Sequence, residues 1–396
     1  MDVAHLIDSI SPEAGGPPRV MLNLAAAQVR LGIGVQVVTR KDAQTDTWWS
    51  QWCERTPALS SIPLRALDCS WYATGARARA VRALGDRANV LHVHGIWKAL
   101  AWQTLANRSR FGAAVLLAPH GMLSPWSLNH HRLKKSVALR LGWRRMLTSA
   151  DAFHAVSAGE EVEIAAAVPG SQIAVLPNGV APVDDAAAVP AQSQRANVGP
   201  PSSRYVLFLA RLHVMKGPDL LLEAFARLIR QLTDEPDLTL VMAGPDYGMR
   251  RALESQARRL RMADRVRFLG AVFGREKWDL IRGAALCCQP SRYEAFSLSL
   301  LESLEAGVPV VTTPEANVPD VALANAGIVC QGEPEELAQA MLHLLTHPQL
   351  RVEMGQRGRA MVYTKYTWSK IAKDSAAVYE ALWRRAGEHR GARASG

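Results

Sequence analysis

The stretch F-L-A-R-L-H-V-M-K-G-P-D, residues 208–219, decides the fold. Its apolar residues up to about Ala210 predict the end of a strand, and Arg211 and Lys216 follow in a loop before a helix. In open parallel sheets, ligands bind at the edge where strands end and helices begin. Two permanent cations at that edge can clamp a diphosphate, although two solvated surface cations would give the same pattern.

Short apolar runs on both sides of this stretch predict further strands, with helices between them. They cover 3–8, 34–39, 89–95, 113–121, 152–157 and 172–179 in the first half, and 205–211, 238–244, 265–270, 285–290, 308–313 and 327–331 in the second. Near-continuous apolar strands that alternate with helices indicate parallel sheets covered on both faces. The predicted fold class is α/β, with two Rossmann-like doubly wound parallel-sheet domains that face each other across a cleft.

The length of 396 residues also fits two domains. We expect an N-terminal domain over 1–180 and a C-terminal domain over 204–375. Residues 181–203, which are rich in Pro, Ala and Ser, are predicted to form the linker. A C-terminal helix and a disordered tail are expected over 376–396, where the chain can cross back to the first domain.

The composition indicates an ordinary globular protein, with 48% hydrophobic and 21% charged residues. Its five cysteines form no C-x-x-C pair, which predicts reduced thiols rather than disulfides or zinc. The chain begins without a basic stretch before an apolar one, and no apolar run approaches the roughly 18 to 20 residues that span a bilayer. We therefore expect a cytoplasmic protein or one that lies on a membrane without crossing it.

A second stretch, Y-E-A-F-S-L-S-L-L-E-S-L-E-A-G-V-P-V-V over 293–311, places two carboxylates near another strand end. Glu294 follows the strand, and Glu302 lies eight residues further along, near the start of a helix. Carboxylates in these positions can accept hydrogen bonds from sugar hydroxyls. The alternative is a capping box, in which Ser299 and Glu302 only close the start of the helix.

The net charge of +10 is unevenly spread, since residues 87–150 contain ten Lys or Arg and no Asp or Glu. Within this block, residues 130–147 predict a basic helix. Its candidate residues for an anionic membrane surface or an acceptor are Arg132, Lys134, Lys135, Trp143, Arg144 and Arg145. The helix either binds anionic lipid or covers apolar surface with its long side chains. Nucleic-acid binding is not expected, because the block has neither a helix-turn-helix signal nor interleaved strand aromatics.

The first half offers glycine and histidine at strand ends. Gly15 and Gly16 follow the first strand, where glycine lets the backbone touch a ligand. This loop is not a G-x-G-x-x-G element, so a nicotinamide cofactor is not expected. His92, His94 and His120 are more often structural than catalytic in such positions, and a zinc site of three histidines has only weak support.

The combination of A-R-L-x3-K-G-P-D, A-G-P and E-A-F-x5-L-E-S-L-x-A-G-V-P-V-V resembles the family-4 retaining glycosyltransferases of the GT-B type. The resemblance covers nearly the whole chain. The His94 and His120 regions, H-G-x-W and P-H-G-M-L-x-P-W, are typical of members that build bacterial surface polysaccharides. Here Ser297 and Ala295 stand where the family usually or often has glycine, and 317–320 resembles a subgroup variant of a region that supports the site.

The resemblance implies a role for each candidate residue. Glu294 and His120 would contact the transferred sugar, and His94 would shape the acceptor pocket. Glu302 would bind the ribose, and the loop at Ala271 and Val272 would face the base. The diphosphate would be held by Gly15, Gly16, Arg211, Lys216 and the amides of Ser297 and Leu298.

The implied activity is retaining transfer of a hexose from a UDP- or GDP-sugar to a lipid-linked or polysaccharide acceptor. The family implies no required metal, and no cofactor is expected. Together with the basic block, the sequence leads us to expect an enzyme on the inner face of the cell membrane. The alternatives are a nucleotide-sugar epimerase of the same fold and a non-catalytic nucleotide-sugar-binding subunit.

Overall fold

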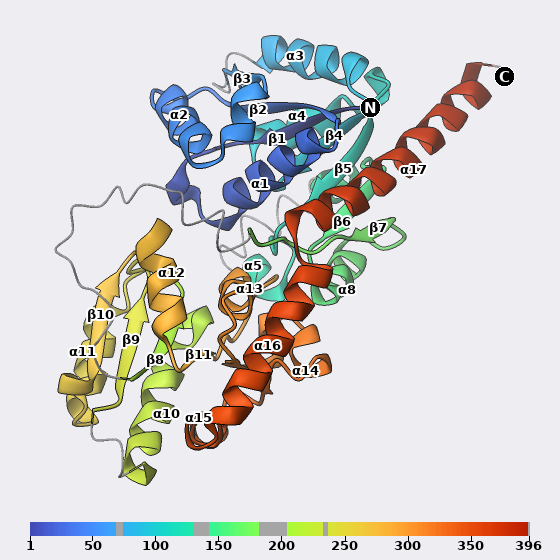
Figure 1. Cartoon of the computed structure of the whole chain (residues 1–396). Helices are drawn as coiled ribbons and strands as arrows, with labels where there is room; N and C mark the ends of the chain where they lie inside the picture. The colour runs from blue at the N-terminus through green and yellow to red at the C-terminus, as the bar shows by residue number, and fades with distance from the viewer. Residues whose placement is uncertain (69–73, 130–141, 182–203, 233–236, 395–396) are drawn as a thin grey trace. The chain divides into compact units, whose positions relative to one another are not determined.

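The computed structural model describes residues 1–68, 74–129, 142–181, 204–232 and 237–394. The chain forms two compact units, one of residues 1–179 with 368–396 and the other of residues 180–367 (Figure 1). The predicted linker, apart from residue 181, lies outside the described residues. Each unit contains one parallel sheet, so the predicted α/β class is confirmed.

The first unit contains a seven-stranded sheet in the order β3-β2-β1-β4-β5-β6-β7. Its strands are β1 (Asp2–Ile7), β2 (Gly34–Arg40), β3 (Leu64–Leu67), β4 (Val90–His94), β5 (Ala114–Ala118), β6 (Ala152–Ala155) and β7 (Ile173–Val175). Its helices are α1 (Gly16–Arg30), α2 (Thr45–Arg55), α3 (Thr74–Arg87), α4 (Ala99–Ala106), α5 (Pro125–Asn129), α7 (Arg144–Leu147), α8 (Ala158–Ala167) and α17 (Trp368–Ala394).

Six of these strands follow the apolar runs of the sequence, whereas β3 was not predicted. It is a short edge strand, Leu-Arg-Ala-Leu, with no buried residue. An edge strand covers no core and therefore needs no apolar pattern.

Helix α17, which follows the second unit in the sequence, belongs to the first unit. α17 packs against α1 and against β4 and β5 (Figure 1). Tyr379 and Leu382 of α17 are buried with Val3, Val90 and Leu116 of the sheet. Residues more than 340 positions apart in the sequence thus share one core, and burial of their apolar surface stabilises the unit.

The second unit contains a six-stranded sheet in the order β10-β9-β8-β11-β12-β13. Its strands are β8 (Tyr205–Leu209), β9 (Thr239–Ala243), β10 (Val266–Gly270), β11 (Leu286–Gln289), β12 (Val310–Thr312) and β13 (Gly327–Val329). Its helices are α10 (Pro218–Gln231), α11 (Arg250–Arg259), α12 (Gly274–Gly283), α13 (Leu298–Glu305), α14 (Asp320–Leu323), α15 (Pro334–Thr346) and α16 (Pro348–Lys365).

Helix α10 shows how the second unit builds its core. Leu221, Leu222, Phe225 and Leu228 follow the spacing of one helix face, and all four are buried. They pack with Phe208 and other strand residues in one apolar cluster. The same face fixes the helix behind the loop that carries Lys216.

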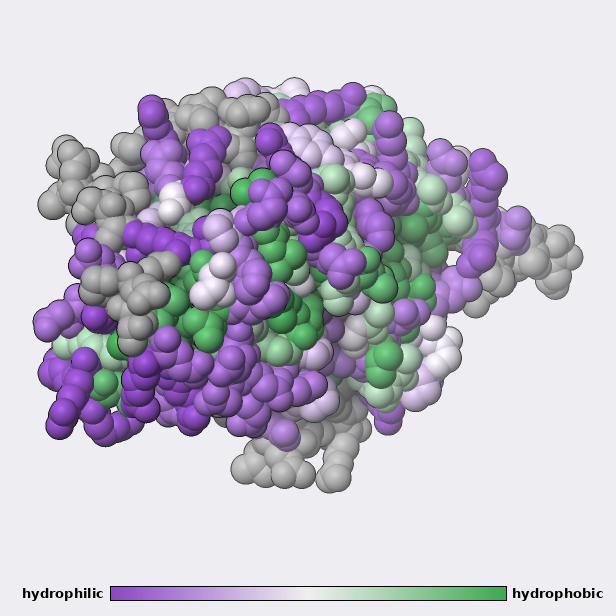
Figure 2. Space-filling model, turned by 60° about the horizontal axis from the view of Figure 1, so that its bottom comes forward, coloured by the Kyte–Doolittle hydropathy of each residue, from purple (hydrophilic) through white to green (hydrophobic). Residues whose placement is uncertain are grey.

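Hydrophilic residues make up most of the face drawn in Figure 2, and hydrophobic residues show between them in patches. Among the described helices, none combines the length and the apolar character that a bilayer crossing requires.

Candidate functional site

Both sheets have a topological switch point, where the strand order reverses. In the second unit this point lies between β8 and β11, so the loops after these strands diverge at the carboxyl edge of the sheet. Ligands of doubly wound folds bind in the crevice at such a point. Lys216 lies in the loop after β8, and Glu294 in the loop after β11.

Lys216 and Glu294 form a buried ion pair at this edge. The Lys216 Nζ lies 2.6 Å from a Glu294 carboxylate oxygen, and the two side chains are 15% and 7% exposed. Gly217 makes the close approach possible, because a Cβ there would lie 2.0 Å from the Pro290 carbonyl oxygen. Gly217 also has a φ of 66°, which favours glycine. The predicted cation and acid therefore meet.

The loop that carries Glu294 is held by further hydrogen bonds. Gln289 Nε2 and Ser291 Oγ donate to the carboxylate of Glu294. The Glu294 amide donates to Glu315, and Asn317 Nδ2 donates to the Glu294 carbonyl at 2.6 Å. The carboxylate accepts every bond it makes here, which suits an ionised group whose orientation is fixed.

Glu302 forms the second ion pair of this edge. It lies on α13, and Lys277 Nζ of α12 lies 2.8 Å from its carboxylate. The capping-box interpretation is wrong, because Ser299 lies inside α13 and its hydroxyl donates to Gln289 at 2.6 Å. Lys277 was missed by the sequence analysis, since one lysine in an otherwise charged helix gives no signal.

Arg211 does not join the buried pair. Its side chain is exposed, and its guanidinium carbon lies 5.0 Å from the centre of the Tyr247 ring. The two predicted diphosphate ligands thus share a loop but differ in environment: Lys216 is held by a carboxylate, and Arg211 stacks at the surface.

The start of α13 only partly matches the prediction. The Ser297 amide donates to the Ala316 carbonyl at 3.1 Å, so it is already engaged and is not free for a phosphate. Leu298 is the first residue of α13, and Ala271 and Val272 follow β10, as expected. The side chain of Val272 is buried, so a contact of this residue with a base would have to be made by its backbone.

In the first unit the switch point lies between β1 and β4. Gly15, with a φ of 92°, precedes α1, and Gly16 is its first residue. Pro17 and Pro18 occupy the first turn and have no N–H group, so the amides of Gly15 and Gly16 are the donors at this helix start.

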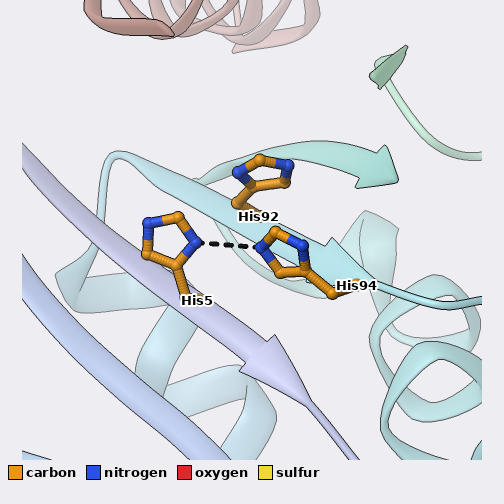
Figure 3. A group of neighbouring side chains, drawn as sticks. All are labelled: His5, His92 and His94. Carbon is orange, nitrogen blue, oxygen red and sulfur yellow. Dashed lines mark hydrogen bonds between the residues drawn. The ribbon is translucent and has the colours of Figure 1, made fainter. Parts of the chain in front are cut away.

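Histidines occupy the strands on both sides of this switch point. His5 on β1 lies opposite His92 on β4, and the two-residue period of a strand places His94 on the same face as His92. All three are buried, and their rings rise from one side of the two strands (Figure 3). The His5 Nδ1 and His94 Nε2 atoms are 3.0 Å apart.

Two more histidines extend this group. The Nδ1 of His94 lies 3.0 Å from His120 Nε2, and the Nε2 of His92 lies 3.1 Å from His154 Nδ1. Both nitrogens of His94 are therefore engaged by other histidines. His94 can therefore shape an acceptor pocket, as predicted from the resemblance, only through the shape of its ring and its hold on His120, and not through a ring nitrogen of its own.

Burial lowers the pKa of these rings, because a charged imidazolium is poorly solvated inside the protein. The pKa of His5 and of His154 is lowered to about 4, and that of His120 to about 3. The pKa values of His92 and His94 also lie well below the ordinary value. At neutral pH the whole group is uncharged.

Glu160 holds the backbone beside His120. Its carboxylate, on α8, accepts hydrogen bonds from the amides of Gly121 and Val156. His120 itself has a φ of 53°, a conformation that is uncommon for residues other than glycine. Burial raises the pKa of Glu160 to about 7. This contact fixes the loop after β5 against β6.

The ligating atoms of His5, His92 and His94 all lie within 4.8 Å of one another, close enough for a metal ion. However, both nitrogens of each ring already have a hydrogen-bonded partner, among them Gln28 and Tyr379. A metal would need lone pairs that these bonds now use. The geometry therefore favours a hydrogen-bonded network over a metal centre.

Most of the predicted basic helix lies outside the described residues, including Arg132, Lys134 and Lys135. In its described part, Arg144 and Arg145 are exposed on α7. Trp143 instead stacks on Trp97, with ring centres 5.9 Å apart, and packs against the core. The ring of Trp143 is thus engaged within the unit.

Two family models match the chain, one to each unit. "Glycosyl transferase 4-like domain" matches residues 15–179, and "Glycosyl transferases group 1" matches residues 191–361.

Curated relatives are glycosyltransferases. The chain is 27% identical to the D-inositol 3-phosphate glycosyltransferase of Segniliparus rotundus over 94% of the chain and 86% of that protein. The corresponding protein of Corynebacterium urealyticum is 32% identical over 48% of the chain and 46% of its own length. The chain thus aligns with only about half of several relatives.

Solved structures share the fold. Anabaena HepE, in complex with UDP and glucose, matches with a TM-score of 0.73 and 19% identity, over 96% of the chain and 100% of that protein. Sucrose-phosphate synthase of Thermosynechococcus elongatus matches with a TM-score of 0.70 and 22% identity, over 97% and 99%.

Proposed function

The chain belongs to the family-4 glycosyltransferases, and from this premise we propose that it transfers a hexose from a nucleotide diphosphate-sugar, with retention of configuration. The proposed donor is a UDP- or GDP-sugar, and the proposed acceptor is a lipid-linked or polysaccharide chain of the cell surface. The enzyme would need neither a cofactor nor a metal ion. It would work at the inner face of the membrane.

The buried pair of Lys216 and Glu294 at the switch point of the second sheet carries this proposal. Transfer places a growing negative charge on the departing phosphate. A preorganised cation at that position stabilises the transition state without reorganisation of solvent. Lys216 is preorganised in this sense, because its carboxylate partner already holds it in a largely buried place.

Glu294 has a different role in this scheme. An ionised carboxylate that accepts bonds from Gln289 and Ser291 cannot donate a proton, so it orients sugar hydroxyls rather than acting as an acid. Retention would follow from attack on the face that the phosphate leaves. The departing phosphate itself would take the acceptor proton.

Two further candidates belong to the same unit as this pair. Glu302, fixed by Lys277, offers carboxylate oxygens to the ribose hydroxyls. Arg211, exposed in the same loop as Lys216, can turn from Tyr247 toward a diphosphate. Anabaena HepE has been solved with UDP-glucose, which makes UDP-sugars the first donors to test.

The two alternatives differ in what they produce. An epimerase would convert the donor sugar without an acceptor, and a binding subunit would hold the donor without turnover. The fold alone does not separate them, since a Listeria monocytogenes protein described as a putative UDP-N-acetylglucosamine 2-epimerase matches with a TM-score of 0.60.

The test is a panel of UDP- and GDP-sugars measured for thermal stabilisation and for sugar release, with and without EDTA. NMR of the product then shows the anomeric configuration. We expect one base and one sugar to be preferred, with turnover that survives EDTA. The matched control is Arg227→Ala, which removes an exposed ion pair of the same unit, whereas Glu294→Gln should abolish turnover. Equal turnover by Glu294→Gln and Arg227→Ala would contradict the proposal that Glu294 takes part in transfer.

A further inference from the structure

The buried histidines belong to one continuous chain of hydrogen bonds. From His120 it passes to His94 and His5, and then from His5 Nε2 to Gln28 Oε1 at 2.8 Å. Gln28 Nε2 continues it to Tyr379 Oη at 3.0 Å. From Tyr379 the chain reaches His92, His154 and finally the carbonyl oxygen of Leu176, at 2.6 Å.

The hydrogen bond between His5 and Gln28, one anchor of this chain, can have only one donor–acceptor direction. Gln28 Oε1 can only accept, so His5 Nε2 must carry the proton of that ring. In a neutral imidazole the other nitrogen then accepts, which makes His94 Nε2 the donor to His5 Nδ1. By the same step His120 Nε2 donates to His94 Nδ1. The amide of Gln28 thus determines the tautomer of three rings.

The other anchor fixes the second branch in the same way. The carbonyl of Leu176 only accepts, so His154 Nε2 donates to it and His154 Nδ1 accepts from His92 Nε2. His92 Nδ1 must then accept the proton of the Tyr379 hydroxyl.

The orientation of Gln28 is itself fixed by helix α17. The Ser375 hydroxyl gives its proton to the Ala372 carbonyl, and Tyr379 gives its proton to His92. Both oxygens can therefore only accept from the Gln28 NH₂ group, at 2.8 and 3.0 Å. Every proton of the network has one consistent position, and all five rings are Nε2–H tautomers.

We propose that Gln28, oriented by Ser375 and Tyr379, is a positioning residue that holds His120 as the Nε2–H tautomer and leaves its Nδ1 as an acceptor for a substrate hydroxyl. The role of the hydroxyl rests on the proposed function, whereas the tautomer does not. Since burial keeps the pKa of His120 at about 3, the ring does not become a donor at Nδ1 near neutral pH.

The experiment is NMR of the full chain with ¹⁵N-labelled histidine, which distinguishes Nδ1–H from Nε2–H rings. The wild type should show five neutral Nε2–H rings. In Gln28→Met the branch of His120, His94 and His5 loses its anchor, so His120 should show a second, Nδ1–H population. His92 and His154 should stay Nε2–H, because Leu176 still anchors them.

The matched control is Gln103→Met, since Gln103 is also a buried glutamine of the first unit but lies outside the network. It should leave all five tautomers and the pH profile of transfer unchanged. In Gln28→Met, kcat/KM should fall about tenfold, as expected when one hydrogen bond is lost in part of the molecules. If this variant does not fold, the double variant Ser375→Ala/Tyr379→Phe releases the amide and should also yield mixed tautomers at His120.

An Nδ1–H ring at His120 in the wild type would overturn the proposal. So would a folded Gln28→Met with an unchanged tautomer, or a purified wild type that carries stoichiometric zinc on these rings. A tautomer shift without any transferase activity would keep this inference and remove the proposed function, so the two failures are distinguishable.

Discussion

Both sheets carry polar residues at their topological switch points, but the residues of the two units are paired in different ways. The first unit uses a neutral network of histidines between β1 and β4. The second uses two ion pairs, Lys216 with Glu294 and Lys277 with Glu302, beside β8 and β11. A neutral network fixes directions of hydrogen bonds, whereas an ion pair fixes charge. In the proposed reaction, the first would recognise a hydroxyl and the second would stabilise a phosphate.

The difference should be largest in acid. The unfolded chain binds protons on histidine near pH 6.5, but folded His5 and His154 do so only near pH 4. Stability that is present above pH 6.5 is therefore lost as the pH falls toward 4, by about 3 kcal/mol for each such ring.

This loss can be measured in the first unit alone. Trp278 is the only tryptophan in the sequence of residues 180–367, so in a Trp278→Phe background tryptophan fluorescence reports the first unit. Urea unfolding at pH 7.5 and pH 5 should give a much lower midpoint in acid. The exposed His343, changed to Gln, should not alter this dependence. An equal midpoint at both pH values would contradict the neutral network.

The next effect concerns the ion pair of the second unit. Lys216→Met should reduce transfer at least about a hundredfold, as loss of a preorganised donor does. It should also destabilise the unit by about 3 kcal/mol, because Glu294 is left buried without its cation.

The double variant Lys216→Met/Glu294→Gln separates the two losses. It removes both charges, so the free energy of unfolding should recover while transfer does not. Recovery of both would mean that the pair is structural only.

Glu160 sharpens the comparison within the first unit, because its effect on stability changes with pH in the direction opposite to that of the histidines. The pKa of Glu160 in the folded protein, about 7, lies above its ordinary value. Its contribution to the free energy of unfolding is therefore fully present below pH 4.5 and is lost as the pH rises through 7. Glu160→Gln removes this dependence. The free energy of unfolding of each protein can be measured with urea. The value for the wild type minus the value for the variant should decrease between pH 5 and pH 8, by on the order of 2 kcal/mol. If the difference in unfolding free energy did not change with pH, the carboxylate of Glu160 would be exposed to solvent rather than buried.

The smallest effect is expected at the surface. Arg144→Ala/Arg145→Ala should weaken co-sedimentation with anionic vesicles at low salt by about 1 kcal/mol for each residue. Arg250→Ala/Arg251→Ala, a basic pair on α11 in the other unit, serves as the control. Equal binding by both double variants would argue against a membrane role for the described part of the basic segment.

Much of the fold could be predicted because a buried parallel strand is a continuous apolar run. Twelve predicted runs contain strands of the two sheets, and the missed β3 is an exposed edge strand without such a run. The meeting of Lys216 and Glu294 was also predictable, since both follow strands that end at one edge.

The histidine network was only partly predictable. The alternation H-V-H in β4 indicates that His92 and His94 share a face, but nothing local in the sequence connects them to His5 or His154. Gln28 and Tyr379 are 351 positions apart, and their contact depends on how α17 packs on the sheet. Such pairings arise from tertiary structure and leave no periodic signal.

The return of α17 to the first sheet has a consequence for synthesis. A ribosome makes the seven strands of this sheet before the second unit, yet the helix that supplies Ser375 and Tyr379 emerges only after that unit. Until then Gln28 has no fixed orientation and the apolar face beneath α17 has no cover. The unit that begins translation before the other is therefore finished after it, and a fragment cut after residue 179 should behave as an incomplete, chaperone-dependent intermediate.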